Sequence, residues 1–280
     1  MHEAVAFRRR VRAWFASPLG SSLQAFETRR LDEVLPHLYG TTALQLGGLG
    51  RGDLLAACAV PTHILHDVWT PTVDEAGAPS RVCGLPEALP YDSRSADLVL
   101  LPHTLDFCDE PHQVLRETAR VLKPEGHVVI LGFNPISLWG LRRLFTRRPR
   151  PAPWCGRFFR LARIKDWLGL LDFELTHGRM LYYRPPLARA VLAQRLRFLD
   201  QAGDRWWPLM AAVYLVVAKK RVVGVTPLPI DWKDRRMLGL AATEPVGRGL
   251  VGGMQRARGR CASLSVSPPH ATPVRPVRRG

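Results

Sequence analysis

The sequence predicts an α/β fold in which helices cover a mostly parallel sheet. Short segments that are apolar on both faces alternate with amphipathic segments between residues 43 and 133. This alternation is typical of parallel strands joined by crossover helices. Apolar residues make up 46% of the 280 residues and charged residues 23%, which is an ordinary composition for a globular protein.

A helix is expected before the sheet. Ser17 can cap it and Pro18 suits its first turn. Apolar residues then recur at helical spacing from Leu23 to Leu38, and Gly40 can end the helix. We therefore expect residues 1–40 to form a helical segment that packs on the core.

The first half of the sheet is predicted from two short apolar runs. Residues 43–46 and 62–67 are expected to form buried strands, and the second run ends in an acid. Between them, residues 53–59 suggest a short helix that Asp53 could cap. Residues 68–80 are rich in turn-forming residues and carry little helix signal.

The second half contains the stronger periodic signals. An amphipathic helix is expected at residues 111–122, ended by the Pro-Glu-Gly turn that follows. Four further strands are expected at residues 96–103, 127–133, 172–183 and 210–220. From residue 222 to 280 no period is sustained, and the Pro, Gly, Arg and Ser content predicts a largely disordered tail.

The net charge of +16 lies in two segments. Residues 140–165 carry nine Lys/Arg and no Asp/Glu, and residues 222–280 carry ten basic and three acidic residues. Together they account for the whole excess. Such segments attract nucleic acid or another polyanion. The alternative interpretation is that they are solvated and only keep the protein soluble.

The cysteines and the hydropathy exclude several classes of protein. Five scattered cysteines form no C-x-x-C pair and no Cys/His group with zinc spacing, so we expect reduced thiols and no metal site. No apolar run approaches the ~20 residues of a spanning helix. The sequence also lacks a signal-peptide pattern, which predicts a cytoplasmic protein without a transmembrane segment.

A glycine-rich loop follows the first predicted strand in "TTALQLGGLGRGDLL", residues 41–55. It matches neither the P-loop pattern nor the dinucleotide pattern G-x-G-x-x-G. It does contain G-x-G-x-G at Gly48, Gly50 and Gly52. Two interpretations remain: the glycines cradle a nucleotide, or they let a helix pack close to a strand.

Three motifs in order resemble the type 11 branch of the class I S-adenosylmethionine-dependent methyltransferases. They are the tetrapeptides at residues 88–91 and 96–99, and Arg-Val-Leu-Lys-Pro-Glu-Gly at residues 120–126. The resemblance implies a Rossmann-like domain at residues 41–221, with seven strands of which the last is antiparallel. It also implies that S-adenosylmethionine binds at the carboxyl ends of the early strands.

The same resemblance assigns the cofactor-binding residues. Gly47, Gly48 and Gly50 would form the cofactor loop, and Asp67 would bind both ribose hydroxyls. Gln45 occupies the position of a family acid, and its amide could still hydrogen-bond the cofactor's ammonium group.

Two more positions depart from the family pattern. Leu49 stands where a glycine is usual. The position of the acid that reaches the adenine amine is Leu85, with Glu87 nearby.

His103 and Asp106 follow the fourth strand, beside the place of the methyl group in the resembled family. They are the candidate catalytic residues, because a histidine suits proton transfer near neutral pH. The alternative is that His103 lines the cofactor pocket through its backbone and ring face.

Residues 137–168 interleave arginines with aromatic residues, among them Trp139, Phe145, Trp154, Phe158 and Phe159. This insert is interpreted first as a lid whose aromatics pack on the sheet, then as a polyanion contact, then as a membrane-surface element. The predicted function is methyl transfer from S-adenosylmethionine to an unidentified acceptor. The alternative is a non-catalytic protein that binds nucleic acid or an acidic partner through the insert and the tail.

Overall fold

The computed structural model describes residues 2–48, 53–68, 80–146, 150–186 and 198–221. Within these ranges, the side chains of residues 2–6, 8, 198, 201, 202, 204 and 208 are not described. The tail predicted at residues 222–280 therefore lies outside the described residues, as do Leu49 and Gly50 of the glycine-rich loop.

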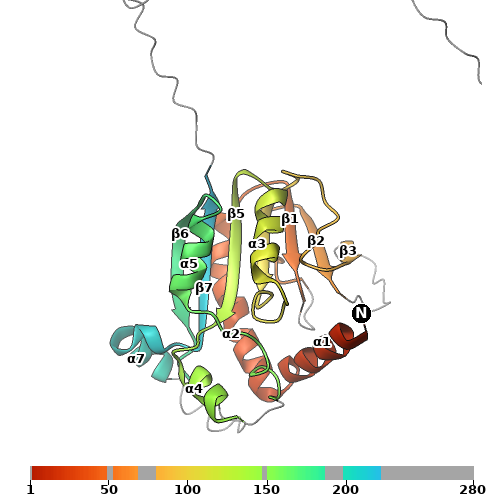
Figure 1. Ribbon diagram of the computed structural model, residues 1–280. Helices are drawn as coiled ribbons and strands as arrows, with labels where there is room; N and C mark the ends of the chain where they lie inside the picture. The colour runs from red at the N-terminus through yellow and green to blue at the C-terminus, as the bar shows by residue number, and fades with distance from the viewer. Residues whose placement is uncertain (1, 49–52, 69–79, 147–149, 187–197, 222–280) are drawn as a thin grey trace, which may run out of the picture. The chain divides into compact units, whose positions relative to one another are not determined.

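The core is a seven-stranded sheet with the strand order β3-β2-β1-β4-β5-β7-β6 (Figure 1). Its strands are β1 (Thr42–Leu46), β2 (Thr62–Asp67), β3 (Ser80–Cys83), β4 (Ala96–Pro102), β5 (Leu122–Phe133), β6 (Phe173–Leu181) and β7 (Val213–Lys220). Neighbouring strands are parallel except at β7, which pairs antiparallel with both β5 and β6. The predicted Rossmann-like sheet is thereby confirmed.

Helices cover both faces of this sheet (Figure 1). They are α1 (His2–Phe15), α2 (Pro18–Val34), α3 (Pro111–Val121), α4 (Leu138–Phe145), α5 (Leu161–Gly169) and α7 (Phe198–Trp206), with short 3-10 turns η1 (Leu35–His37) and η2 (Pro208–Met210). Because side chains alternate along a strand, Leu98 and Leu100 of β4 join the core cluster of α2. Val99 and Leu101 join the cluster of α3 and α5 on the opposite face.

The predicted start of α2 is confirmed. The Ser17 side chain accepts a hydrogen bond from the Gly20 amide, and Pro18 is the first helical residue. Gly20 also lies against α1, where a Cβ would come within 2.4 Å of the Trp14 carbonyl oxygen. The turn between the two helices therefore depends on both the cap and the glycine.

The helix predicted at residues 53–59 is wrong, because this segment forms turns. Side-chain oxygens accept hydrogen bonds from backbone amides that would have no partner in the first turn of a helix. The Leu55 amide donates to Asp53 Oδ1 at 2.8 Å and the Leu54 amide to Gln45 Oε1 at 2.9 Å. Asp53 Oδ2 also pairs with His63 Nδ1 at 2.7 Å.

One additional strand and one strand boundary also differ from the sequence prediction. The four-residue β3 was not expected, because it follows a segment rich in turn-forming residues. The strand expected at residues 127–133 begins earlier, at Leu122, and runs through the Pro-Glu-Gly segment. Glu125 adopts a positive φ of 65° there, so the predicted turn is a local irregularity at the start of β5.

The motif residues Leu89 and Tyr91 are bound by α3. The Arg120 guanidinium donates to the carbonyl oxygens of Tyr91 and Leu89 at 2.8 and 2.9 Å. The Leu89 amide in turn donates to Glu117 Oε2 at 3.1 Å. These bonds fix the loop before β4 to the helix that follows it.

Asp97 of β4 fixes the start of β1 by similar hydrogen bonds. Asp97 Oδ2 accepts from the amides of Thr41 and Thr42 at 2.9 and 3.1 Å, and pairs with Lys123 Nζ at 2.8 Å. Burial raises the pKa of Asp97, but the bonds from Lys123 and Thr41 outweigh it and lower the pKa to about 2.

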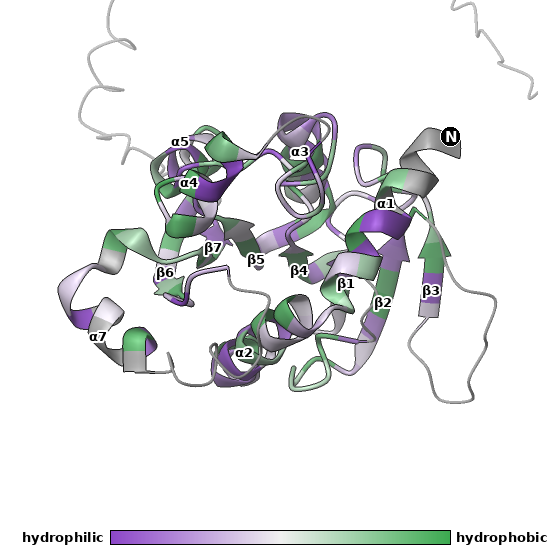
Figure 2. Cartoon of the chain, turned by 90° about the horizontal axis from the view of Figure 1, so that it is seen from below, coloured by the Kyte–Doolittle hydropathy of each residue, from purple (hydrophilic) through white to green (hydrophobic). Residues whose placement is uncertain are grey.

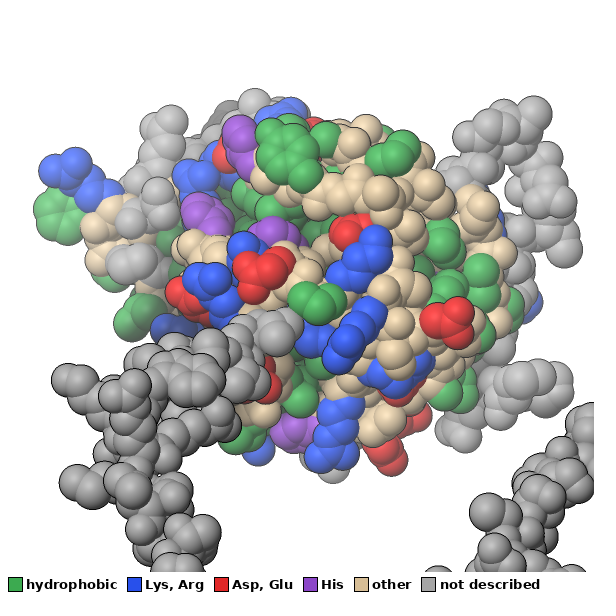
Figure 3. All heavy atoms as spheres, turned by 90° about the horizontal axis from the view of Figure 1, so that it is seen from above, with side chains coloured by type: hydrophobic (Ala, Val, Ile, Leu, Met, Phe, Trp, Pro, Cys, Tyr) green, Lys and Arg blue, Asp and Glu red, His purple; other side chains and the backbone are tan. Residues whose placement is uncertain are grey.

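The amino-terminal end of the sheet carries paired charges. Besides Asp97 and Lys123, Glu125 pairs with Lys219 at 2.6 Å. Figure 3 shows acidic and basic side chains intermixed on this end. The described chain also ends here, because β7 runs back from the opposite end (Figure 1).

We expect Gly20→Ala to destabilise the protein by about 1–3 kcal/mol, because the new Cβ would meet backbone atoms of α1 that cannot rotate away. The matched control is Gly169→Ala at the end of α5, where nothing lies within 4 Å of the new Cβ. It should leave the free energy of unfolding unchanged or raise it by up to about 1 kcal/mol. Urea unfolding of both variants measures the difference, and equal values would contradict the close approach of α1 and α2.

Candidate functional site

The parallel topology brings most of the predicted site residues to one end of the sheet. Gly47 and Gly48 follow β1, Asp67 ends β2 and His103 follows β4. Figure 2 looks onto this end and shows α1, α2, α4 and α7 around the strand ends. Open α/β sheets bind ligands at this end, outside the carboxyl ends of their strands.

The first turn of the glycine loop is fixed against β2. Gly47 has a φ of 89°, a left-handed conformation that favours glycine. Its amide donates to the His66 carbonyl oxygen at 2.7 Å, and the Gly48 amide donates to Asp67 Oδ2 at 3.0 Å. Asp67 Oδ1 accepts from the Val68 amide at 2.7 Å, so the carboxylate is held at the end of β2 beside the loop.

Gln45 joins the two ends of the same loop. Its side chain is fully buried, donates to the Gly47 carbonyl oxygen at 3.3 Å and accepts from the Leu54 amide at 2.9 Å. An ionised acid at this position could accept the second bond but could not donate the first. The amide that replaces the family acid is therefore matched to this loop. Its contact with a cofactor's ammonium group stays a prediction.

The loop after β3 begins beside Asp67. The Gly84 amide donates to the Asp67 carbonyl oxygen at 3.0 Å. A Cβ on Gly84 would come within 2.7 Å of the ring of the buried His66. Leu85 follows with 53% of its surface exposed, and Glu87 is half-buried. The two predicted residues thus share a loop with its start fixed at the end of β2.

His103 lies between two carboxylates. Its Nε2 pairs with Glu27 Oε1 at 2.8 Å and its Nδ1 with Asp106 Oδ2 at 3.0 Å. All three side chains are at most 2% exposed. Asp106 Oδ2 also accepts from the Phe133 amide at 3.0 Å, and the imidazole stacks on the Phe133 ring. We call Glu27, His103 and Asp106 the buried ion cluster.

The carboxylates hold His103 in its charged form. Burial by itself lowers the pKa of His103, but the Glu27 charge and the hydrogen bonds to Asp106 and Glu27 outweigh it and raise the pKa to about 9. Burial raises the pKa of Asp106. A buried imidazolium with both nitrogens bonded has no position left to accept a proton. In this geometry the imidazole joins α2 to the end of β4, and a catalytic role for His103 and Asp106 stays a prediction.

The sequence analysis does not identify Glu27 as a site residue, although the spacing of the residues around it contains a signal. It lies in α2 between Leu23 and Leu31, at a four-residue spacing that puts all three side chains on one buried stripe. An acid on an apolar stripe indicates a buried partner. The sequence does not say that the partner is His103, 76 residues away.

Aromatic side chains from the insert at residues 137–168 cover the end of β5. Trp139, Trp154, Phe158 and Phe159 are each at most 8% exposed, whereas Phe145 is 80% exposed. Trp14 of α1 joins this group, with its ring centroid 5.8 Å from that of Trp139. This part of the insert is therefore packed into the core, and a role as a lid stays a prediction.

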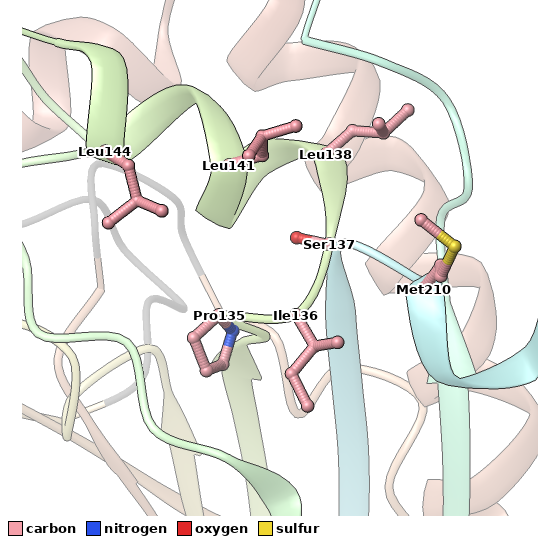
Figure 4. A pocket seen from close by; sticks show the side chains of 7 residues that line it. All are labelled: Pro135, Ile136, Ser137, Leu138, Leu141, Leu144 and Met210. Carbon is pink, nitrogen blue, oxygen red and sulfur yellow. The ribbon is translucent and has the colours of Figure 1, made fainter.

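An apolar pocket of about 280 Å³ opens just beyond β5 (Figure 4). Its lining comes from Pro135, Ile136, Ser137, Leu138, Leu141, Leu144 and Met210. Asn134 fixes its walls, because its side-chain amide donates to the carbonyl oxygens of Leu209 and Ala211 at 2.8 and 2.9 Å. The Ile136 amide donates back to Asn134 Oδ1 at 3.1 Å.

Among the described residues, no group of three or more His, Cys, Asp or Glu side chains could hold a metal ion. Cys58, Cys83 and Cys155 are free thiols. No helix in the described ranges is long and apolar enough to cross a membrane.

We expect Glu27→Ala to lower the free energy of unfolding by about 3–5 kcal/mol, because it leaves a buried imidazolium with one of its two partners. Glu33→Ala on the same helix is the control. Glu33 is 51% exposed and pairs with Arg30 at the surface, so its loss should cost about 0–1 kcal/mol. Urea unfolding compares the two, and a Glu27 effect as small as that of Glu33 would contradict the ion cluster.

The buried ion cluster should also make stability depend on pH. The pKa of His103 is higher in the folded chain, about 9, than the ~6.5 of an unfolded histidine. Its contribution is therefore complete below about pH 6.5 and is lost as the pH rises through about 9. Urea midpoints measured across this window should fall for the native sequence and fall less for Glu27→Gln. Parallel curves would contradict the assignment.

Comparison with known proteins identifies the family. The sequence profile of a family described as a methyltransferase domain matches residues 47–130. The uncharacterized protein YafS of Escherichia coli is 34% identical over 221 residues, which cover 78% of this chain and 84% of YafS. An uncharacterized protein of Mycobacterium tuberculosis is 30% identical over 181 residues, which cover 63% of this chain and 62% of that protein.

A solved structure shows the same fold. The S-adenosylmethionine-dependent methyltransferase of Thermotoga maritima covers 79% of this chain and 100% of its own, with a TM-score of 0.53 and 17% identity. Together with the family profile and the YafS relationship, this shows that the chain belongs to the class I S-adenosylmethionine-dependent methyltransferase family.

Proposed function

We propose that this protein binds S-adenosylmethionine across the carboxyl ends of β1, β2 and β4 and transfers its methyl group to an acceptor. One observation carries the proposal: the Asp67 carboxylate is fixed beside the Gly47–Gly48 turn, 3.0 Å from the Gly48 amide. An acid and a glycine turn at neighbouring strand ends suit a ribose and the chain attached to it.

The residues at this place fit such a ligand. A carboxylate has about four lone-pair sites, so Asp67 can accept ribose hydroxyls while it keeps its bonds to the loop amides. Gly47 and Gly48 present no Cβ, which lets the backbone approach the ligand closely. Gln45 is hydrogen-bonded to Gly47 and Leu54 and so joins the two ends of the loop.

The bound cofactor would supply an activated methyl group on its sulfonium. The protein then mainly has to align the acceptor with that group and keep water out. The buried ion cluster would hold the site in the geometry that this alignment needs, because it joins α2 to the ends of β4 and β5. The aromatic side chains around Phe133 exclude water at the same end.

The alternative, a non-catalytic nucleic-acid-binding protein, is less well supported. Single-stranded nucleic acid needs exposed rings on which bases stack. Of the six aromatics in the insert, five are buried, and the guanidinium of Arg142 lies over the ring of Trp154 at 4.3 Å. The remaining exposed ring, Phe145, does not form a stacking platform by itself.

We expect Asp67→Ala to weaken the binding of S-adenosylhomocysteine at least about tenfold, because each hydrogen bond to a charged group contributes ~1.5–3 kcal/mol. Calorimetric titration of the purified full chain gives the dissociation constant, and NADH is the control ligand. Asp166→Ala, at an exposed position of α5, is the control variant and should bind like the native protein.

Either of two results would overturn the proposal. The first is a folded native protein that binds neither S-adenosylhomocysteine nor S-adenosylmethionine. The second is an Asp67→Ala variant whose affinity equals that of Asp166→Ala.

A further inference from the structure

Large apolar side chains are concentrated on one surface of the protein. Nine of the thirteen large hydrophobic residues that are exposed in the described part of the chain fall in residues 136–145 and 206–210. We call them the α4–η2 surface: Ile136, Leu138, Leu141, Leu144, Phe145, Trp206, Trp207, Leu209 and Met210. Exposed apolar residues that occur singly need no explanation, but a concentration of this kind marks an interaction site.

The two segments of this surface meet at the pocket. Leu138, Leu141 and Leu144 of α4 line it together with Met210 of η2 (Figure 4). The bonds from Asn134 to the carbonyl oxygens of Leu209 and Ala211 hold the second segment against the first. The surface is therefore a fixed feature of the fold.

The helix α4 is apolar on both sides. Trp139 is fully buried, and a Cβ on Gly140 would come within 2.0 Å of the Pro135 carbonyl oxygen, so this side is packed against the core. Leu138, Leu141 and Leu144 recur every three residues and form a second stripe that is 40–74% exposed. A helix that packs through one face does not need a second apolar stripe for folding.

The charged residues of the two segments that form this surface have one sign. Residues 136–146 and 205–210 contain Arg142, Arg143 and Arg205 and no Asp or Glu. The amino-terminal end of the sheet differs, because Lys123 pairs there with Asp97 and Lys219 with Glu125, and acidic and basic side chains are intermixed (Figure 3). Leucine, phenylalanine and tryptophan beside arginine are the composition of elements that lie in the interface of an anionic membrane.

We propose that the α4–η2 surface docks on an anionic lipid membrane. Charge complementarity favours this occupant over two others. A second copy of the chain, docked through the same surface, would bring arginine against arginine. The tail at residues 222–280 carries ten basic and three acidic residues, so it has the same sign as the surface. The proposal does not depend on cofactor binding.

Cosedimentation of the full chain with vesicles tests the proposal. Vesicles of phosphatidylcholine mixed with phosphatidylglycerol should bind the native protein, and vesicles of phosphatidylcholine alone should bind it less. The double variant Leu144→Ser/Phe145→Ser changes side chains that are 74% and 80% exposed, so folding should be unaffected. It should weaken binding to the mixed vesicles at least about tenfold, because two large apolar side chains no longer enter the interface.

Leu170→Ser is the matched control. Leu170 is 82% exposed at the end of α5 and is not part of the α4–η2 surface, so this variant should bind like the native protein. Titration with S-adenosylhomocysteine should give the same affinity for all three proteins. A failure of the docking proposal is thereby distinguished from a failure of the proposed function.

A second measurement locates the contact. Trp206 and Trp207 are 69% and 55% exposed, so lipids with brominated acyl chains should quench their fluorescence. The variant Trp206→Phe/Trp207→Phe should lose most of that quenching while it still sediments with the vesicles. Unchanged quenching in this variant would contradict the proposed contact.

Several results would overturn the proposal. If the native protein and Leu144→Ser/Phe145→Ser bind mixed vesicles equally, the contact is made elsewhere, for example by the basic tail. If the double variant instead converts a dimer to a monomer in light scattering, a second copy covers the surface. Binding to polyglutamate but not to vesicles, weakened by the same variant, would assign the surface to an acidic protein.

Discussion

The ion pairs of His103 with Glu27 and Asp106 are the constraint on which the carboxyl end of this sheet depends. Three ionisable groups are held where almost no water reaches them, and the cost of removing a charged group from water is offset only while its partners are present. The cluster fixes α2 to the end of β4, and through the Phe133 amide it fixes both to β5. Trp139 and Phe158 of the insert stack on Phe133 at the same place.

The two ends of the sheet carry different groups. At the amino end, Asp97 and Lys123 close the start of β1 with bonds that are accessible to water. These residues belong to the motifs that identify the family, and their role here is structural. At the carboxyl end, a glycine turn and the Asp67 carboxylate leave backbone and acid beside each other. The family signature therefore marks the frame, and the proposed binding function depends on a few residues at the other end.

The insert at residues 137–168 shows how one composition can serve two purposes. Arginines, aromatic residues and leucines alternate along the insert, but the fold buries some of the apolar side chains and exposes others. Trp139 and Trp154 are buried, with the guanidinium of Arg142 over the Trp154 ring, whereas Phe145 and the leucine stripe of α4 are exposed. The first set closes the core at the end of β5. The second set leaves an apolar, basic surface beside a pocket, which a lid alone does not require.

The sequence by itself determined six of the seven strands, the cap of α2 by Ser17, and the gathering of Gly47 and Asp67 at one end, because periodicity, capping and the parallel order of the first strands are local or follow from local patterns. Only the tertiary structure decided the rest. It paired Glu27 with His103 across 76 residues, replaced the helix expected at residues 53–59 by turns, and turned the leucine stripe of α4 outward. Each outcome depends on which groups meet across the fold, and a local pattern of apolar and polar residues does not specify the partner.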